Sequence, residues 1–308
     1  MEVIGKVTLD DSKYIGKDLY SDGNIEDELL EIVKTRESSE YEAVIREKHE
    51  WAVLYHLSER RGNIVDWMED DGEASVLEVG SGCGAVTGTL SKKYKSVTCI
   101  ELSKKRSLIN AYRNRDRDNV KILLGNYKDV ERDLDETYDL ITLIGVFEYA
   151  KGYMGSEDPY ADFLNSLKKH LKPGGKIVIA IENKLGLKYW AGCAEDHCGR
   201  LYEGLEGYLN TDSVRTFTKA GLEKVINDCG CRAEGFYYPY PDYKLPTVIY
   251  SDAYLPKIGE LNNNYNNFDV DRLLTFDESK VFDTVIEDGL FPIYSNSFLV
   301  VVREGVKR

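Results

Sequence analysis

A glycine-rich bend at residues 80–84 constrains the fold of this chain more than any other segment. The apolar run Val76–Val79, which contains the acid Glu78, leads directly into Gly80-Ser81-Gly82-Cys83-Gly84. Such a run is typical of a buried strand that turns sharply into a helix. Glycine is needed there because only a residue without a Cβ can make the turn and leave the backbone open to a ligand. The N–H groups at the start of the next helix then face that ligand.

A second apolar strand ends in a carboxylate about twenty residues after the first glycine. Its last residues are Thr98-Cys99-Ile100-Glu101. An acid in this position can accept both hydrogens of a ribose diol, so the bend and the acid together predict a nucleoside cofactor. The spacing leaves its kind open, because Gly80-x-Gly82-x-x-Ala85 satisfies the dinucleotide fingerprint and Gly80-x-Gly82-x-Gly84 satisfies that of S-adenosylmethionine (SAM).

Three details favour SAM. The negative charge of Glu78 would repel a pyrophosphate, whereas it would attract the ammonium group of methionine. About seventy residues precede the loop, whereas dinucleotide domains often begin with it. The later pattern predicts a strand at 138–144, a helix near 160–171, and a Lys-Pro-Gly-Gly turn at 172–175 into a strand at 176–182.

In order and spacing, the glycine loop, Glu101, the strand at Asp139 and the Lys-Pro-Gly-Gly turn resemble the class I SAM-dependent methyltransferases over roughly residues 70–235. The resemblance implies an α/β, Rossmann-like core with parallel strands at 75–79, 96–101, 120–124, 138–144 and 176–182, and SAM as cofactor. A nucleotide-binding α/β domain of another kind is the alternative, because fold patterns recur across functions.

The same resemblance implies a set of cofactor contacts. Asn126 would accept a hydrogen bond from the adenine amino group through its amide oxygen. The segment 145–148 would border the methyl-transfer site. The implied cofactor-binding residues are Glu78, Gly80, Ser81, Gly82, Gly84, Glu101, Leu102, Asn126, Tyr127, Gly145 and Phe147.

The chain is about a hundred residues longer than a minimal core of this kind. Residues 1–72 are predicted to form a helical extension. This extension would brace the sheet, cover the cofactor as a lid, or do both. It would contain a strand near 2–9, a helix near 25–34 and a helical stretch at 51–67. The core would occupy 73–182 and 215–239. The remaining segments are an acceptor-side insertion at 183–214, an accessory insertion at 240–295, and the last strand and tail at 296–308.

Net charge and composition argue against some classes of binding partner. The net charge of −14 opposes phosphate backbones, so nucleic-acid substrates are disfavoured. No apolar run approaches the roughly 18 residues of a membrane helix, and the N-terminus lacks the pattern of a signal peptide, which predicts a cytoplasmic protein without membrane insertion. The six cysteines are expected to be free thiols, and their spacing predicts no metal site. The oligomeric state is left open.

The insertion at 183–214 and the residues just after it carry the candidates for catalysis. His197 would act as a base or hold the acceptor. Arg200 and Arg215 could bind an acceptor carboxylate by charge-assisted hydrogen bonds. The 240–295 segment is rich in tyrosine, which suits either an acceptor groove or a packed subdomain whose hydroxyls satisfy buried hydrogen bonds.

Three functions are compatible with these residues. The pattern Asp196-His197-x-Gly199-Arg200, followed by Arg215-Thr216-Phe217, resembles bacterial methyltransferases of surface-glycan and ribosomal-peptide gene clusters. One branch of these esterifies the C-terminal carboxylate of lanthipeptide-like products, so O-methylation of a peptide carboxylate is the leading hypothesis. The alternatives are O-methylation of a sugar hydroxyl, with His197 as base, and a non-catalytic SAM-binding subunit.

Overall fold

The computed structural model describes residues 1–18, 20–69, 72–264 and 272–305, and the chain divides into two compact units. The first unit comprises residues 1–143 and 166–176, and the second comprises 144–165 and 177–308. The boundary runs through one strand, β7 (Leu171–Glu182), whose first half belongs to the first unit and whose second half belongs to the second. The domain boundaries expected from the sequence stay a prediction.

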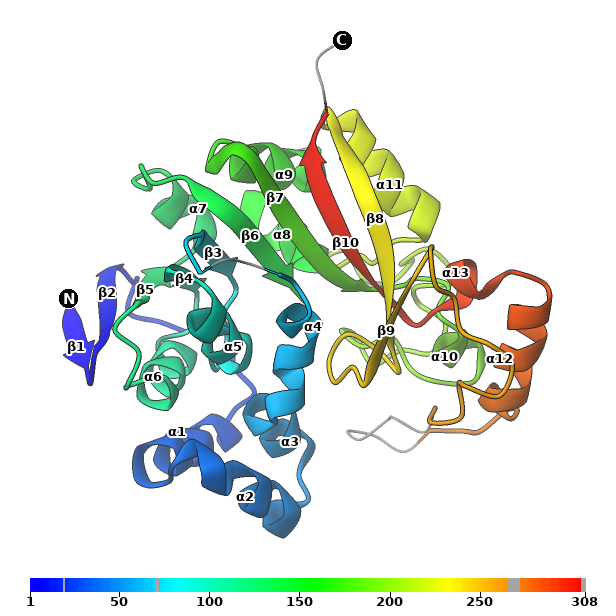
Figure 1. Cartoon of the computed structure of the whole chain (residues 1–308), viewed down its shortest axis with the longest axis horizontal. Coiled ribbons are helices and arrows are strands. Elements are labelled where there is room, and N and C mark those ends of the chain that lie inside the picture. The colour runs from blue at the N-terminus through cyan, green and yellow to red at the C-terminus, as the bar shows by residue number, and fades with distance from the viewer. Residues whose placement is uncertain (19, 70–71, 265–271, 306–308) are drawn as a thin grey trace. The chain divides into compact units, whose positions relative to one another are not determined.

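The first unit is built on mainly parallel strands. Strands β2, β5, β4, β3 and β6 are neighbours in that order and pair in parallel, and β1 pairs antiparallel with β2 (Figure 1). The strands predicted at 75–79, 96–101 and 138–144 are confirmed, and the one predicted at 120–124 is one residue longer. Their bounds are β1 (Glu2–Ile4), β2 (Val7–Lys13), β3 (Ser75–Val79), β4 (Ser96–Glu101), β5 (Val120–Gly125) and β6 (Tyr138–Ile144).

Helices connect these strands and build the N-terminal extension. Helix α6 begins where the Ser103 hydroxyl accepts a hydrogen bond from the Arg106 N–H, and Asp18 accepts two more from the Lys104 and Lys105 N–H groups. The helices are α1 (Ile25–Thr35), α2 (Tyr41–Lys48), α3 (Trp51–Leu57), α4 (Asn63–Asp66), α5 (Ala85–Lys93), α6 (Lys104–Arg113) and α7 (Tyr127–Glu131), with 3₁₀ turns η1 (Ser38–Glu40) and η2 (Glu59–Gly62).

Three local predictions are corrected. The N-terminal strand is a hairpin, β1 and β2, which turns at residues 5–6 and places β2 beside β5. The helical stretch at 51–67 is broken into α3, η2 and α4, because the Ser58 hydroxyl accepts the Arg60 N–H and starts a new turn. The Lys-Pro-Gly-Gly segment is part of β7, where the Lys172 ammonium lies 2.7 Å from the Asp139 carboxylate of β6.

The N-terminal extension packs on the start of the parallel core. Leu29, Val33 and Leu57 of the extension form a buried apolar cluster with Cys83 of the glycine loop and Ile109 of α6. In Figure 1 the blue helix α1 lies beside α6. The extension therefore packs on α6 and the glycine loop, and its roles as a brace of the sheet and as a lid stay predictions.

A buried ion pair fastens this brace. The Arg106 guanidinium lies 2.7 Å from the Glu26 carboxylate, which is fully buried, and 2.8 Å from that of Asp22. The His56 ring nitrogen contacts the same Asp22 carboxylate at 2.8 Å.

The second unit is built on antiparallel strands. The second half of β7 pairs with β10, β10 pairs with β8, and β8 pairs with β9. Helix α11 begins after Thr218, whose hydroxyl accepts the Gly221 N–H. The further elements are β8 (Cys231–Tyr240), β9 (Val248–Ser251), β10 (Ser297–Glu304), η3 (Phe147–Tyr149), α8 (Ala150–Met154), α9 (Pro159–Lys168), α10 (Leu187–Trp190), α11 (Lys219–Asp228), α12 (Glu278–Glu287) and α13 (Phe291–Tyr294).

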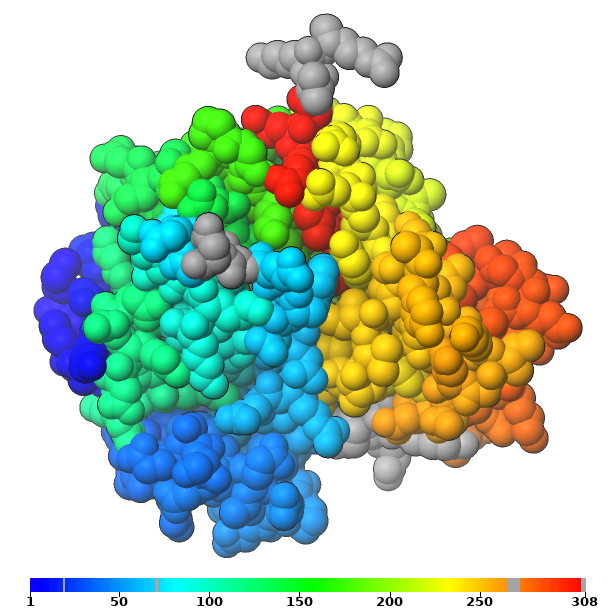
Figure 2. Space-filling model, in the orientation of Figure 1, coloured from blue at the N-terminus to red at the C-terminus, as the bar shows by residue number. Residues whose placement is uncertain are grey.

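The tyrosines of the 240–295 segment fit the packed-subdomain alternative. Tyr240 and Tyr250 are buried, and their hydroxyls bond to the Asn263 N–H at 2.7 Å and to the Glu260 carboxylate at 3.3 Å. Residues 252–260 are exposed apart from Pro256, and they lie in the yellow-to-orange surface of the space-filling view (Figure 2).

The Arg106–Glu26 pair makes a stability prediction. Arg106→Met should lower the free energy of unfolding by about 3–5 kcal/mol, because it leaves a buried carboxylate without its cation. Adding Glu26→Gln should recover much of this loss, since the buried charge is then removed as well. Urea denaturation of the single and double variants measures both effects.

Lys105→Met is the matched control, because Lys105 is the neighbouring cation on α6 and pairs with Asp27 at the surface. It should cost less than about 1 kcal/mol. Equal losses in the two single variants would contradict the assigned role of the buried pair.

Candidate active site

The glycine loop is held by backbone and carboxylate contacts at the ends of β3 and β4. The Gly82 N–H donates to the Glu101 carboxylate at 2.7 Å, and the Ser103 N–H donates to its other oxygen at 2.9 Å. The Gly80 N–H donates to the Ile100 carbonyl at 2.8 Å. Burial raises the pKa of Glu101, although these N–H groups and Arg106 act in the opposite direction. The acid predicted to bind ribose therefore also fixes the shape of the loop.

A polar network behind the loop comes from α5 and α6. The Thr87 hydroxyl donates to Glu78 at 2.5 Å, and the Asn110 amide donates to Thr87 at 3.1 Å and to the Ser81 hydroxyl at 3.2 Å. The Asn114 amide donates to the Gly84 carbonyl at 3.2 Å. All six residues of this network are buried, so the loop is held rigidly from behind.

Burial also sets the charge of Glu78. Because its carboxyl group is enclosed, burial raises its pKa to about 7, against the lowering effect of the Thr87 and Cys99 hydrogen bonds. A cation placed beside this group would favour its ionised form.

Two glycines of the loop differ in what surrounds them. Gly82 has φ +53°, and a Cβ added there would meet no atom within 4 Å. Gly84 has φ +78°, and a Cβ there would collide with the Asn110 and Asn114 side chains. The Cβ side of Gly82 is open while its N–H is held by the Glu101 carboxylate, so the loop offers bare backbone to a ligand. These residues fit a nucleoside cofactor, and Gly84 serves the packing of the loop.

The other predicted cofactor residues of the first unit take structural roles as well. The Asn126 amide oxygen accepts the Lys128 N–H at 3.0 Å and caps α7, which leaves a second lone pair for an adenine amino group. Tyr127 is buried, and its hydroxyl contacts that of Ser166 at 2.9 Å. Leu102 is half-buried beside Glu101.

Gly145 and Phe147 belong to the second unit. The Gly145 N–H donates to the Ala180 carbonyl at 2.9 Å, and the Tyr243 hydroxyl crowds the position of a Cβ. Phe147 is fully buried among the rings of Tyr160, Phe163 and Phe217. Phe147 thus packs in an aromatic core, and its predicted contact with a cofactor stays a prediction.

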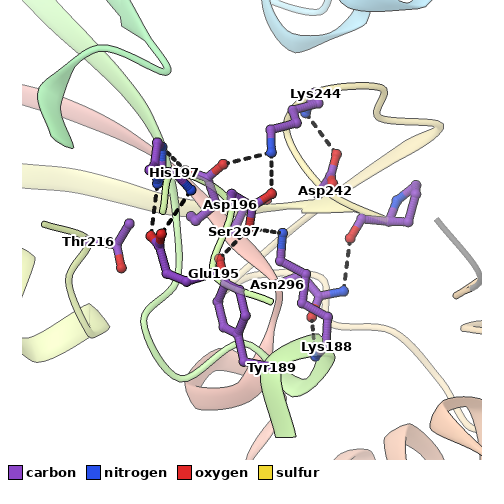
Figure 3. Close-up of polar contacts among 12 residues, drawn as sticks. Lys188, Tyr189, Glu195, Asp196, His197, Thr216, Asp242, Lys244, Asn296 and Ser297 are labelled. Atoms are coloured by element: carbon purple, nitrogen blue, oxygen red, sulfur yellow. Dashed lines mark hydrogen bonds and ion pairs between the residues drawn. The ribbon is translucent and has the colours of Figure 1, made fainter. Parts of the chain in front are cut away.

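His197 is held by Glu195. Its Nδ1 lies 2.9 Å from the Glu195 Oε1, and the His197 and Cys198 N–H groups donate to Oε2 at 2.8 and 2.9 Å (Figure 3). The Tyr208 hydroxyl donates to Oε1 at 3.2 Å. Burial opposes ionisation of Glu195, but His197 and these donors prevail and lower its pKa to about 2.

The opposite nitrogen of His197 faces two further carboxylates. Its Nε2 lies 3.4 Å from Glu148 Oε1 and 3.7 Å from Glu182 Oε2. Burial alone would lower the pKa of His197, but Glu182, Glu148 and Glu195 raise it well above its ordinary value. Burial raises the pKa of Glu148, and Glu182 adds to this effect. Glu148, Glu182 and His197 offer ligand atoms that all lie within 4.8 Å of one another, so this group could hold a metal ion.

Two lysines and an aspartate extend the charged group. Lys188 lies 2.8 Å from Asp196, and Lys244 pairs with Asp196 and lies 3.0 Å from Glu182 Oε1 (Figure 3). The Tyr189 hydroxyl donates to Asp196 at 2.6 Å. Although burial acts against it, the two lysines lower the pKa of Asp196 well below its ordinary value. As expected for adjacent side chains, Asp196 diverges from His197, and Glu195 orients the ring instead.

The arginines predicted to grip an acceptor lie at the surface. Arg200 and Arg215 are exposed. Their backbones support the buried group, because the Arg200 carbonyl accepts the Glu195 N–H at 2.9 Å and the Arg215 N–H donates to the Glu148 carbonyl at 3.1 Å. The structure brings His197 together with carboxylates and leaves the arginine side chains outside that cluster.

Sequence reasoning did not single out Glu182 or Glu195, and it included Glu148 only as part of the segment 145–148 predicted to border the methyl-transfer site. Glu182 ends a strand, as Glu101 does, so the signal used for Glu101 could have identified it. No local pattern indicates that Glu195 orients His197, because that contact depends on the turn at 195–198.

Comparison with known proteins identifies a methyltransferase domain in the first part of the chain. Residues 77–177 match the family model described as a methyltransferase domain. The ribosomal RNA small subunit methyltransferase A of Mycoplasma mycoides is 26% identical over 207 residues, 64% of this chain and 67% of that protein. The (S)-coclaurine N-methyltransferase of Thalictrum flavum is 35% identical over 83 residues, 26% of this chain, and the match spans only 22% of that relative's length.

A SAM-dependent methyltransferase from Clostridium acetobutylicum superposes with a TM-score of 0.46 at 12% identity, covering 87% of this chain and 97% of that one. None of the helices in the described ranges is long and apolar enough to cross a lipid bilayer. The matched residues 77–177 contain the glycine loop, Glu101 and the strand at Asp139, which are the motifs that pointed to SAM. Residues 77–177 of this chain are accordingly a methyltransferase domain with the motifs of a SAM site.

Proposed function

We propose that this enzyme methylates an oxygen atom, and that the acceptor is a hydroxyl group such as that of a sugar. The observation that carries the proposal is the buried group of Glu148, Glu182, Glu195 and His197 in the second unit. Within the described residues, the Glu148 and Glu182 oxygens have no hydrogen-bond donor. An acceptor hydroxyl can donate to such an oxygen, whereas an acceptor carboxylate would add a further negative charge.

In the proposed step, a methyl group moves from SAM to the acceptor oxygen. Bound SAM supplies a methyl group on a positively charged sulfur. As the acceptor oxygen forms its bond to that carbon, the carbon–sulfur bond breaks and its electron pair stays on the sulfur. The hydroxyl proton passes to the Glu148 carboxylate, whose raised pKa suits a proton acceptor. The enzyme otherwise contributes orientation, which can supply roughly 7–11 kcal/mol.

The first unit would bind SAM through the groups that the fold leaves open to a ligand. The Gly82 backbone would lie against it, Glu101 would accept the ribose hydroxyls, and Glu78 would face the ammonium group. Glu101 has lone pairs left after binding the Gly82 and Ser103 N–H groups, so its structural and ligand roles are compatible.

Methylation of a peptide carboxylate is the second candidate. The Lys184 ammonium is partly buried, and burial together with the charge of Arg215 lowers its pKa. Two neighbouring cations of this kind suit an anionic acceptor. The name of the Mycoplasma relative points instead to ribosomal RNA, but the net charge of −14 opposes a polyanion.

Gly82→Ala tests the assigned cofactor loop. The new Cβ should weaken SAM binding at least tenfold, about 1.4 kcal/mol, because it occupies the side on which the backbone is open. Calorimetric titration with SAM measures this loss. The left-handed conformation should cost about 1–2 kcal/mol of folding stability.

Gly155→Ala is the matched control, since Gly155 has φ +58° and open space around its Cβ position. It should show the same loss of stability with unchanged SAM affinity. The assignment of the loop fails if both variants bind SAM equally well.

Glu78→Gln should act in opposite directions on stability and binding. The pKa of Glu78 is 4.5 in the unfolded chain and about 7 in the folded chain. The folded protein therefore loses stability as the pH rises between these two values, because the buried carboxyl group must ionise. The variant should therefore be more stable than the parent at pH 8, by up to about 3 kcal/mol, with little gain near pH 4.5. Its SAM affinity should fall because the ammonium loses a counter-ion.

Thermal denaturation at both pH values and SAM titration at pH 8 measure these effects. Glu42→Gln, at an exposed position of α2, should change neither. A Glu78→Gln variant with a pH-independent stability difference would show that the carboxyl group is not held in the way described.

The acceptor class is tested by the product. With SAM and a panel of glycosides and peptides, the mass gain of one methyl group should appear on hydroxyl compounds and survive mild base, as an ether does. Glu148→Gln should lower kcat by about 10²–10⁴ with unchanged SAM affinity, because the proton acceptor is lost.

A base-labile product would be an ester and would favour the peptide carboxylate instead. In that case Arg215→Ala should raise the KM for the peptide, while Glu148→Gln should leave kcat almost unchanged.

A further inference from the structure

The second unit contains a cation-binding arrangement whose geometry is independent of the acceptor. Glu148 and Glu182 are fully buried, and the His197 side chain is 7% exposed. The two glutamates follow or end different strands, and His197 comes from the turn at 195–198. Three residues distant in sequence therefore direct ligand-type atoms at one point.

The geometry points to a divalent metal ion bound by Glu148, Glu182 and the Nε2 of His197. The separations of Nε2 from the two carboxylate oxygens are 3.4 and 3.7 Å. Bonds of about 2.1 Å at tetrahedral angles place ligand atoms about 3.4 Å apart. The imidazole nitrogen is thus already spaced from each carboxylate oxygen as two ligands of one ion are, and all three ligand atoms lie within 4.8 Å of one another.

The surroundings of His197 match those of a metal-binding histidine. Such residues almost always pass their second ring N–H to a carboxylate, which fixes the tautomer and the ring orientation. The Glu195 carboxylate oxygen lies 2.9 Å from His197 Nδ1 and can accept its N–H. Glu195 is itself held by hydrogen bonds from the His197 and Cys198 N–H groups and from the Tyr208 hydroxyl. With Nδ1 protonated, the lone pair of Nε2 faces Glu148 and Glu182.

The carboxylate oxygens are short of partners. Among the described residues, none of the four oxygens of Glu148 and Glu182 receives a hydrogen bond, although their atoms are inaccessible to water. Lys244 approaches Glu182 Oε1 at 3.0 Å as an ion pair, without hydrogen-bond geometry. Buried charged oxygens of this kind are costly unless they are paired or coordinate a metal.

The charge of the group also fits a divalent ion. Glu148, Glu182, Glu195 and Asp196 bring four negative charges, and Lys188 and Lys244 bring two positive ones. Asp242 adds a further negative charge that acts on both lysines. With His197 neutral, three negative charges remain; one divalent ion would offset two of them, whereas a protonated His197 would offset only one.

The donor set narrows the ion. One imidazole and two carboxylates suit Mn²⁺, Fe²⁺ or Zn²⁺ better than Mg²⁺ or Ca²⁺, which prefer oxygen ligands alone. One oxygen of each glutamate suffices for the ion. Ion binding requires neither SAM nor an acceptor, and it is tested without them.

The experiment uses the full chain after treatment with a chelator. Calorimetric titration with MnCl₂, ZnCl₂ and MgCl₂ at pH 7.5 should show one Mn²⁺ or Zn²⁺ per chain and weaker Mg²⁺ binding, and the bound Mn²⁺ should show an altered paramagnetic resonance spectrum. Glu182→Gln should weaken Mn²⁺ binding at least about 100-fold, and Glu195→Gln about 10–100-fold through looser positioning of His197.

Glu203→Gln is the matched control, because Glu203 is a buried carboxylate of the same insertion whose oxygens accept hydrogen bonds from Asn210. It should bind Mn²⁺ as the parent does. Circular dichroism verifies folding of each variant, and Glu148→Gln replaces Glu182→Gln if the latter does not fold.

The proposal is overturned if the parent chain binds no Mn²⁺ or Zn²⁺ up to millimolar concentration, or if Glu182→Gln and Glu148→Gln bind as tightly as Glu203→Gln. Loss of ether formation with intact ion binding would instead refute the proposed acceptor alone.

Discussion

The hydrogen bond from the Gly82 N–H to the Glu101 carboxylate is the interaction on which the cofactor site depends. It closes the loop after β3 onto the end of β4 with a strand-end acid. The loop has no side chains of its own to hold this shape, apart from Ser81 and Cys83. Thr87, Asn110 and Asn114 supply the missing contacts from α5 and α6. A bare backbone open to a ligand is thus possible only because neighbouring helices hold it from behind.

The N-terminal extension also supports the glycine loop. Its helices pack on Cys83 and Ile109, and its acids hold Arg106 of α6. A minimal core would leave this side of α6 and the loop in water. Because the extension buries it, the surroundings of the glycine loop depend on contacts from the first seventy residues.

The second unit holds four acidic side chains close together and away from water. Lysines 188 and 244 and the Glu195 hydrogen bonds offset part of the charge. The remainder is concentrated on Glu148 and Glu182 beside His197. A buried group with this excess of negative charge suits a proton or a metal ion, and it disfavours an anionic acceptor. Both proposals for this unit follow from that charge.

The sequence by itself determined the parallel strands, the glycine bend and Glu101, because hydrophobic period, glycine spacing and strand-end acids are local signals. It also pointed to Glu78 and His197, but not to what surrounds them. Only the tertiary structure decided that Asn110 and Asn114 support the loop, that Glu195 rather than Asp196 orients His197, and that Arg200 and Arg215 lie at the surface. These outcomes depend on contacts between residues 2 to 30 positions apart, whose energies are set by burial and by the direction of each side chain. Neither quantity is encoded in residue type and spacing alone, since desolvation and charge pairing arise only when distant elements pack together.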